Sequence, residues 1–519
     1  MAKLLTSAQM SQADQRTIEE LGLPGVVLME NAGRGCVDVL WSRVSDLRQR
    51  RVLVLAGAGN NGGDGFVIAR HLLQAGVRVS ALLFGQGEQL KGDAAINYTV
   101  FVGLGGRVRS VTCPDDLKGF NHQLSHASIV VDAVFGTGLA RDVGGVFADV
   151  FERVNRAGRM VLAVDIPSGI SSDSGALLGV ALRADWTVTF AAEKIGHRVQ
   201  PGAGYCGEVI CVPIGIPDHY IDRPEHNTAR NVMDDLVIPN RESDAHKGRF
   251  GHLLVVAGSV GKGGAAVLTA LGAQRCGPGL VTVASPASAQ IQIAGQLTEA
   301  MTLPLPEQNG VLSKEAMATI EASGVKPTAL AIGPGLGQSD GARTLLRRLM
   351  VHLAIPMVLD ADALNLLSQE KSGPGSCLRA RNGPTVLTPH PGEMARLLGS
   401  TVAEVQDHRI DITRKAAKDW QVWMVLKGSG SIIAAPDGQV WINETGNNGL
   451  AAGGSGDLLT GIIAGLLTQG WSLASATRAG VWLHGKAADL AVENGGGEAG
   501  LMARDLLPEI WTLRNQFAT

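Results

Sequence analysis

Glycines and polar side chains with a spacing suited to ligand binding follow the first strongly apolar run of the chain. The run RVLVLA leads into GAGNNGGDG, residues 57–65. The glycines spell G-x-G-x-x-G at Gly57, Gly59 and Gly62. Between a strand and a helix, this spacing is typical of loops that place a dinucleotide pyrophosphate at a helix N-terminus. The stretch also contains Asp64, whose charge would repel a pyrophosphate, so the glycines alone do not establish a redox cofactor site.

A second feature of redox sites is missing further along the chain. Dehydrogenases of this type carry an acidic residue at the end of the second strand, where it binds the ribose hydroxyls. Here that strand ends in LLFGQGEQ, with no carboxylate at its tip. A redox site and a ligand-free glycine turn remain alternatives, but the pattern favours a ligand of another kind.

Oxygen-bearing side chains follow several predicted strands of the first half. Asn61, Asp132 and Ser168 should meet where the carboxyl ends of parallel strands lie together. Their amide, carboxylate and hydroxyl oxygens suit a hard cation, monovalent or alkaline-earth, while the lack of clustered His and Cys disfavours zinc. Asp165, in DIPSG at another strand tip, is a candidate general acid or base. The alternative is an aspartate that caps its own turn.

The second half contains a glycine-rich stretch that suits phosphoryl transfer. In NETGNNGLAAGGSGDLLTGIIAGLL, residues 443–467, glycines crowd before an apolar helix, where backbone N–H groups and the helix dipole form an anion hole. Asp457, in the first turn of that helix, is placed to take a proton from a hydroxyl that attacks a phosphate. In the alternative interpretation, the glycines serve close helix packing and Asp457 is a cap.

Four further loops of the second half each follow a predicted strand and should open toward the crevice that contains Asp457. They are GPGLG at 333–337, DADALN at 360–365, TPHPGEM at 388–394 and LKGSGSII at 426–433. His390, between two prolines, is a candidate substrate contact, with a rigid turn residue as the alternative. The segment around Lys262 is not a Walker A loop, because no Ser or Thr follows the lysine and the glycine spacing differs.

The elements that position these loops predict two α/β domains. Short Val/Ile/Leu runs alternate with amphipathic stretches, which indicates a parallel sheet covered by helices, with two further helices before it that pack on one face. A polar segment with three prolines, residues 217–246, interrupts this rhythm, which then restarts. We place the junction near residue 225, giving domains 1–225 and 226–519, as expected for 519 residues.

Composition narrows the possible partners. A formal charge of −3 and 4% aromatic residues argue against nucleic acid as a ligand. The opening residues lack the apolar core of a signal peptide, and no run of 18 apolar residues occurs, so we expect a cytoplasmic protein without membrane contact. The six cysteines form no C-x-x-C pair, and we expect buried, reduced thiols.

Five stretches of the first half together resemble the N-terminal domain of the NAD(P)H-hydrate repair enzymes: LMENAG, GNNGGDG, DAVFGTGL, DIPSG and TFAAEKIGH. The resemblance implies a Rossmann-like epimerase that interconverts the R and S forms of hydrated NADH and NADPH. It also implies a potassium ion near Asn61, Asp132 and Ser168. The substrate contacts that it implies are Asn60, Asn61, Gly62, Gly63, Asp64, Gly136, Thr137, Gly138, Leu139, Ala140, Arg141, Asp142 and Asp165, the last as catalytic residue.

The second half resembles the C-terminal domain of the same enzymes, a relative of ribokinase-like kinases, through HKG, GPGLG, DADALN, TPHPGE and TGNNGLAAGGSGD. That resemblance implies dehydration of the S hydrate with ADP and Mg²⁺, ADP being favoured because the fused arrangement is similar to the bacterial type. The implied substrate contacts are Ala266, Gly335, His390 and the catalytic Asp457. The implied nucleotide contacts are Lys427, Gly428, Ser429, Gly430, Ser431 and Gly456. The stretch NNGLAAGG departs from the family, which often has a Met and a Thr there.

The resemblance therefore implies one repair cycle in one chain, and commonly a homo-oligomer. Two other functions remain open at this point. The second domain could be a vitamin or sugar kinase, and the first could be a non-catalytic binding module. Classical dehydrogenase activity is a weaker third alternative.

Overall fold

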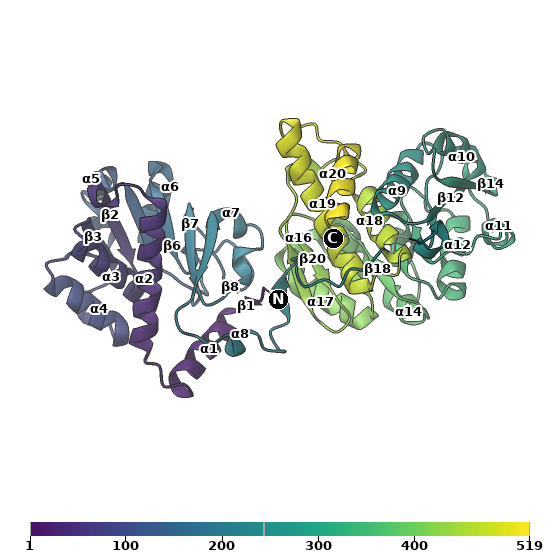
Figure 1. Ribbon diagram of the computed structural model, residues 1–519. Helices are drawn as coiled ribbons and strands as arrows, with labels where there is room; N and C mark the ends of the chain where they lie inside the picture. The colour runs from purple at the N-terminus through teal and green to yellow at the C-terminus, as the bar shows by residue number, and fades with distance from the viewer. Residues whose placement is uncertain (1, 242–243, 518–519) are drawn as a thin grey trace. The chain divides into compact units, whose positions relative to one another are not determined.

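The computed structural model describes residues 2–241 and 244–517, and these form two compact α/β units. One unit comprises Lys3–Thr228, and the other begins at Ala229 and also includes Ala2. The expectation of two α/β domains is confirmed. Figure 1 labels the elements used below.

The N-terminal unit is built on a seven-stranded sheet in which every strand pairs in parallel. Its spatial order is β4 (Arg107–Val111), β3 (Arg78–Phe84), β2 (Arg51–Ala56), β5 (Ile129–Ala133), β6 (Met160–Val164), β7 (Trp186–Phe190) and β9 (Glu208–Val212). β2 is the first strand of the sheet in chain order. β3 and β4 are added on one side of it, and β5, β6, β7 and β9 on the other. This is the strand order of the Rossmann fold, so the topological switch point, where such sheets bind ligands, lies between β2 and β5.

Helices cover both faces of this sheet, because alternate residues of each strand point to opposite sides. Val52 and Val54 of β2 pack with α2 (Gly25–Arg43), α3 (Asn60–Gln74) and α4 (Gly92–Gly103). Leu53 and Leu55 pack with α5 (Phe120–His126) and α6 (Val146–Ala157). A strand buried on both faces must be apolar throughout, which explains the continuous run RVLVLA.

The two helices expected before the sheet are present, but only one packs on it. α2 covers the sheet, whereas α1 (Ser7–Glu19) packs on a separate small pair of strands, β1 (Leu4–Leu5) and β8 (Glu193–Lys194). The side chain of Thr6 caps α1 by accepting a hydrogen bond from the Gln9 N–H at 3.2 Å. The prediction for α1 was wrong because a helix pattern shows which face is apolar and not which element covers it.

The C-terminal unit contains a ten-stranded sheet. Its order is β10 (Thr228–Arg230), β21 (Val440–Asn443), β20 (Ser431–Ala434), β19 (Trp423–Leu426), β18 (Thr385–Leu387), β17 (Met357–Leu359), β16 (Ala329–Ile332), β11 (His252–Val256), β12 (Leu280–Pro286) and β13 (Met301–Leu305). From β19 to β13 all pairs are parallel, while β19, β20 and β21 pair in antiparallel fashion. Two short strands, β14 (Glu307–Gln308) and β15 (Val311–Leu312), form a separate hairpin.

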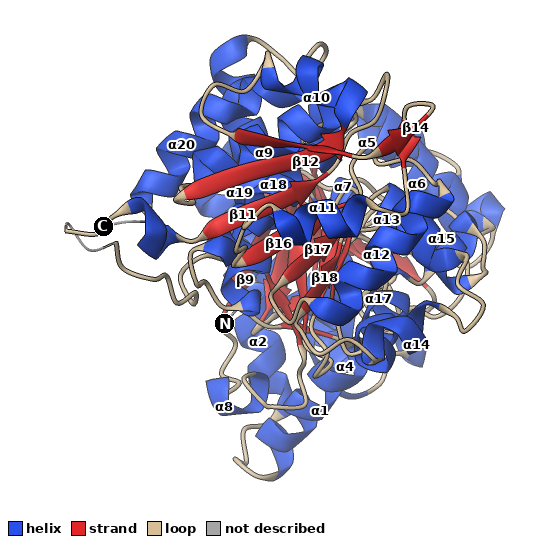
Figure 2. Cartoon of the chain, turned by 90° about the vertical axis from the view of Figure 1, so that its right-hand side faces the viewer, coloured by secondary structure: helices blue, strands red, loops and turns tan. Residues whose placement is uncertain are grey.

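Helices flank the strands of this sheet (Figure 2). They are α9 (Gly263–Cys276), α10 (Ala287–Ala294), α11 (Ala316–Ala322), α12 (Asp340–His352), α13 (Asp362–Ser368), α14 (Pro374–Arg379), α15 (Pro391–Leu398), α16 (Val402–Asp407), α17 (Arg409–Trp420), α18 (Ser455–Thr468), α19 (Leu473–Gly495) and α20 (Leu507–Gln516). The shorter helices α7 (Ala203–Cys206) and α8 (Asp218–Ile221) belong to the N-terminal unit.

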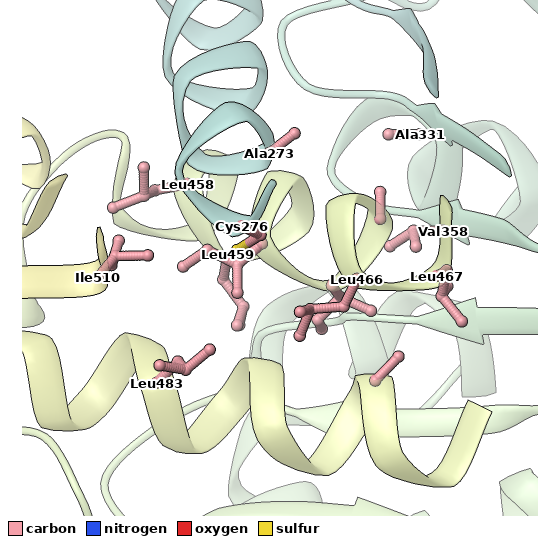
Figure 3. Packing of buried hydrophobic residues seen from close by; sticks show 14 of the residues in the cluster. Ala273, Cys276, Ala331, Val358, Leu458, Leu459, Leu466, Leu467, Leu483 and Ile510 are labelled. Carbon is pink, nitrogen blue, oxygen red and sulfur yellow. The ribbon is translucent and has the colours of Figure 1, made fainter. Parts of the chain in front are cut away.

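The core of the C-terminal unit is organised around α18. Leucines of α18 pack against α9, α19 and α20 and against the sheet, as Figure 3 shows for Leu458, Leu459, Leu466 and Leu467. Two glycines of α18 bring it unusually close to α9. A Cβ on Gly461 would lie 2.0 Å from the Thr269 carbonyl oxygen, and one on Gly465 would lie 2.8 Å from the Ala273 carbonyl oxygen. The middle of α18 is therefore packed tightly against α9.

The cysteines are only partly as expected. Cys36, Cys206 and Cys276 are buried, but Cys113 and Cys211 are exposed and Cys377 is partly exposed. The prediction failed for these because an apolar neighbourhood in the sequence does not show which side of a strand or loop faces the core. Within residues 2–241 and 244–517, no helix has both the length and the apolar character needed to cross a bilayer.

Candidate active sites

The glycine loop after β2 lies at the switch point, pressed against the loop that follows β5. A Cβ on Gly57 would lie 2.0 Å from the Val134 carbonyl oxygen, and one on Gly62 would lie 1.9 Å from the Gly57 carbonyl oxygen. Gly59, the N-cap of α3, has no atom within 4 Å of such a Cβ. Gly57 and Gly62 thus permit close packing, and Gly59 leaves the N-terminus of α3 open.

Asp132, in β5, and Ser168, in the loop after β6, form a fully buried contact. The Ser168 N–H donates to Asp132 Oδ2 at 2.7 Å, and Ser168 Oγ donates to Asp132 Oδ1 at 2.6 Å. The Phe135 N–H donates to Ser168 Oγ at 2.8 Å. Burial raises the pKa of Asp132 to about 6, although the hydrogen bonds from Ser168 act in the opposite direction. Two of the three predicted cation ligands therefore touch each other.

Asn61, the third predicted ligand, lies beside the same loop. Its side chain is the nearest group to Gly136, 3.2 Å from the position of a Cβ there. Its Nδ2 is buried without a hydrogen-bond partner in the described part of the chain. The two ends of an amide have the same shape, so a turned amide would present Oδ1 at this point. An orphaned amide next to Gly136, together with the buried oxygens of Asp132 and Ser168, suits a hard cation such as potassium.

Asp165 is held by a buried lysine. Lys194 Nζ, on a residue that is 1% exposed, donates to Asp165 Oδ1 at 2.6 Å, and Thr189 Oγ1 donates to the same oxygen at 2.9 Å. Burial acts to raise the pKa of Asp165, but the Lys194 charge and these hydrogen bonds outweigh it, so the pKa lies below its usual value. Asp165 also has a φ of +67°, a strained backbone for a residue other than glycine. The aspartate is therefore an ionised, rigidly oriented carboxylate.

His197 is neutral and donates a hydrogen bond to the backbone of Asp165. Its Nδ1 accepts from the Lys194 N–H at 3.0 Å, so the proton lies on Nε2, which donates to the Asp165 carbonyl oxygen at 2.8 Å. Burial first, then the Lys194 charge, lowers the pKa of His197 to about 4. We did not predict roles for Thr189, Lys194 or His197. Their signal was present in TFAAEKIGH, where a lysine and a histidine stand beside a buried strand.

The remaining predicted epimerase residues divide into two groups. Gly62, Gly63 and Asp64 are buried at the start of α3, and a Cβ on Gly63 would lie 2.7 Å from Met29 Sδ. Asn60 is exposed at the open end of the helix. The other seven lie in the partly to fully exposed loop between β5 and α6, with Gly136 next to Asn61: Gly136, Thr137, Gly138, Leu139, Ala140, Arg141 and Asp142.

In the C-terminal unit, Asp457 lies in the first turn of α18 beside a lysine. Lys427 Nζ lies 3.2 Å from the position of a Cβ on Gly456, and it donates to Asp360 Oδ1 at 2.8 Å. Thr460 Oγ1 donates to the other Asp360 oxygen at 2.8 Å. Burial first, then the Asp360 charge, raises the pKa of Asp457 to about 6, and Lys427 limits this rise. The structure therefore brings together three of the predicted residues: Lys427, Gly456 and Asp457.

Glu393 adds a second carboxylate, and His390 fixes it. Glu393 Oε2 lies 3.9 Å from Lys427 Nζ and accepts from the His390 N–H at 2.8 Å. His390 is the N-cap of α15, and its Nδ1 accepts from the Gly392 N–H at 3.0 Å. A turn role was the alternative for His390, and the structure shows one. Its ring is about half exposed, so a substrate contact remains a prediction.

The predicted nucleotide loop, residues 427–431, connects β19 to β20 around a buried arginine. Arg409 Nη2 donates to the Gly430 carbonyl oxygen at 3.2 Å, and Ser431 Oγ donates to the Gly428 carbonyl oxygen at 2.9 Å. Gly428 and Gly430 have φ values of +136° and +65°, which favour glycine. The loop is thus preformed in the structure.

Ala266 and Gly335 lie at a packed junction. Ala266 is fully buried in α9, 3.1 Å from the position of a Cβ on Gly258. Gly335 accepts from Ser259 Oγ through its carbonyl oxygen at 2.8 Å and has a φ of +60°. Ala266 exposes no surface in this structure, so a ligand contact by it remains a prediction.

A large cavity of the C-terminal unit lies elsewhere. It has a volume of about 1210 Å³ and is lined by the outer side of α9, the end of α19 and the segment before α20. It includes Gly453, just before α18, but none of the four predicted substrate contacts. We take the charged cluster at Asp457 as the site, because cavity size alone does not identify chemistry.

Comparison with known families accounts for both units. Residues 25–196 match the family described as YjeF-related protein N-terminus, and residues 253–511 match NAD(P)H-hydrate dehydratase. The bifunctional NAD(P)H-hydrate repair enzyme of Moorella thermoacetica is 43% identical over 519 residues, covering 99% of this chain and 97% of that one. The enzyme of the same name from Coxiella burnetii is 37% identical over 517 residues, covering 99% and 100%.

A solved structure similar to this chain is the ADP/ATP-dependent NAD(P)H-hydrate dehydratase of Bacillus subtilis, co-crystallised with ATP and Mg²⁺. It is 33% identical and covers 54% of this chain and 94% of that one, with a TM-score of 0.46. Because the similarity to these relatives extends over 99% of this chain, the chain belongs to the family of bifunctional NAD(P)H-hydrate repair enzymes.

Proposed function

We propose that this chain repairs hydrated NADH and NADPH by two activities, epimerisation of the R and S hydrates in residues 1–225 and ADP-dependent dehydration of the S hydrate in residues 226–519. The observation that carries the proposal is the position of Asp457 in the first turn of a glycine-led helix, beside Lys427. An enzyme that dehydrated one epimer alone would leave the other unrepaired. Epimerisation in the same chain converts the R hydrate to the S hydrate, so that both epimers can be repaired.

In the dehydration, Asp457 removes the proton of the ring hydroxyl. The oxygen then attacks the terminal phosphorus of ADP, the P–O bond to AMP breaks, and the hydroxyl becomes a phosphate ester. Phosphate is a much better leaving group than hydroxide. Its departure with loss of a ring proton restores the double bond and gives NAD(P)H, AMP and phosphate. Lys427 and the backbone N–H groups before α18 stabilise the charge that develops on the phosphoryl oxygens.

Mg²⁺ suits this donor set, because it binds oxygen ligands and usually uses only one or two protein carboxylates together with phosphates. Glu393 is the residue that would hold it, since Asp360 already spends both oxygens on Lys427 and Thr460. When bound, the ion neutralises charge on the nucleotide. We propose ADP as the natural co-substrate and a homo-oligomer as the assembly, both from the family resemblance.

In the epimerisation, Asp165 removes the proton of the same ring hydroxyl, and the strain at its backbone keeps the carboxylate oriented. Potassium would be held by Asn61, Asp132 and Ser168, where it would offset negative charge near the anionic substrate. Substrate would lie over the open end of α3, where Gly59 leaves the helix N-terminus accessible.

The test uses a mixture of the R and S hydrates, purified protein and the return of reduced-nicotinamide absorbance. Without ADP we expect no return, and with ADP we expect complete return. Asp457→Asn should abolish the return but keep epimerisation, while Asp165→Asn should consume about half of the hydrate. Equal loss of both activities in either variant would contradict two separate sites. A stable phosphorylated product would instead identify a small-molecule kinase.

A further inference from the structure

Arg409, the first residue of α17, is a buried arginine whose guanidinium group binds the predicted nucleotide loop, residues 427–431. It is 7% exposed. Its Nη2 donates to the carbonyl oxygens of Lys427 and Gly430 at 3.4 and 3.2 Å, and its Nη1 donates to Gln406 Oε1 at 2.8 Å. Burial lowers the pKa of Arg409 to about 10, so the group is charged at neutral pH. The loop is therefore held by a buried cation through its backbone carbonyl groups.

The contact with Arg409 also sets the direction of the loop's N–H groups. In a planar trans peptide, the C=O of one residue and the N–H of the next point in opposite directions. Because the Lys427 carbonyl is turned toward Arg409, the Gly428 N–H points away from it. Within residues 2–241 and 244–517, the N–H groups of Gly428, Ser429 and Gly430 donate to no protein acceptor. Successive free N–H groups of this kind suit an anion.

Gly428 shows how closely the guanidinium group and the loop fit together. A Cβ on Gly428 would lie 3.0 Å from Arg409 Nη1 and 3.2 Å from Nη2, so the guanidinium group lies directly against the backbone of the turn. Gly428 also has a φ of +136°, which residues with a side chain rarely adopt. Loss of the guanidinium group would leave empty space beside this turn and release the carbonyl groups that orient it.

We propose that Arg409 is a positioning residue of the ADP-dependent dehydration, which orients residues 427–431 so that their free N–H groups bind the oxygens of ADP. Arg409 acts through the loop and does not itself touch the reacting atoms. This inference rests on the proposed dehydratase function and adds the residue that shapes its nucleotide site.

Arg381 provides a matched control in the same unit. It is 8% exposed, burial lowers its pKa to about 10, and its guanidinium group also binds backbone carbonyl groups, those of Leu353 and Pro384 at 3.0 and 2.8 Å. These contacts lie just before β17 and β18 begin, whereas residues 427–431 follow the end of β19. The three strands are parallel, so the two arginines serve opposite edges of the sheet.

The first test is Arg409→Met in the full chain, with initial rates of dehydration of pure S hydrate. Methionine keeps the apolar stem but removes every donor, so the KM for ADP should rise at least about tenfold. The KM for S hydrate, and kcat at saturating ADP, should stay within about threefold. Arg409→Lys keeps the charge but not the fork of donors and should raise the KM for ADP at least about threefold. In Arg381→Met the KM for ADP should stay within about threefold, even where urea unfolding shows an equal loss of stability.

A second test uses the unmodified protein and is independent of whether the variants fold. Amide hydrogen exchange of residues 428–430 should slow at least about tenfold with saturating ADP, because ligand oxygens then accept from these N–H groups. Unchanged exchange would overturn the proposal. So would a KM for ADP within threefold of normal in Arg409→Met, or an equal rise in Arg381→Met. If the unmodified protein does not dehydrate S hydrate with ADP, the proposed function itself is wrong, whereas slowed exchange would still support nucleotide binding by the loop.

Discussion

The acidity of Asp457 gives the dehydratase site a testable pH dependence. A general base must be ionised, and the pKa of Asp457 is raised to about 6 by burial and by the Asp360 charge, against Lys427. Lowering the pH through 6 protonates Asp457 and removes the base. Its ionised fraction is about 90% at pH 7 and about 9% at pH 5, so kcat for dehydration should fall about tenfold between them.

Asp360→Asn should move this acid limb to lower pH. The change removes a negative charge that raises the pKa of Asp457 and also leaves Lys427 with less compensation, so both effects favour the ionised form. An interaction of about 1.4 kcal/mol between two charges, which an effective dielectric constant of about 20 allows near a protein surface, corresponds to about one pH unit. Asp360 and Asp457 both lie beside Lys427, so we expect a shift of about one unit.

The assay is the initial rate of NADH formation from pure S hydrate with saturating ADP, between pH 5 and 8. Asp362→Asn is the matched control, because Asp362 accepts from the Gly337 N–H at 2.8 Å, in another loop, and its charge does not act on Asp457. The acid limb of the pH profile of Asp362→Asn should stay near pH 6. A flat profile down to pH 5, or a limb that moves to higher pH in Asp360→Asn, would refute the assignment of Asp457 as the base.

Three further outcomes can be checked independently. Lys427→Met should raise the KM for ADP by at least about tenfold, because it removes the cation beside the helix N-terminus, while R-to-S conversion stays unchanged. Replacing potassium in the buffer with tetramethylammonium should slow R-to-S conversion but not dehydration of pure S hydrate. Gly461→Ala should cost about 2 to 5 kcal/mol of unfolding free energy, since its Cβ would meet the Thr269 carbonyl oxygen at 2.0 Å, whereas Gly264→Ala, with open space around it, should change stability by less than about 1 kcal/mol in urea unfolding.

The strands, the loops that follow them and the glycine-led helix start could be predicted without a structure, because these depend on local patterns. RVLVLA predicts a strand buried on both faces, and β2 is one. The glycines before Asp457 predict a helix N-terminus, and α18 begins there. The family resemblance could be recognised at the same stage, since it rests on short motifs with fixed spacing.

Which charged side chains come into contact depends on how the strands are arranged in space. Asp165 and Lys194 are 29 residues apart, and the packing of β8 against β1 brings the lysine to the end of β6. Asp360 reaches Lys427 across 67 residues, because β17 and β19 lie on either side of β18 in one parallel sheet. Strand order and burial set these contacts, and with them the pKa values on which both proposed reactions depend. A linear pattern shows which residues follow a strand, but not which other strand will lie beside it.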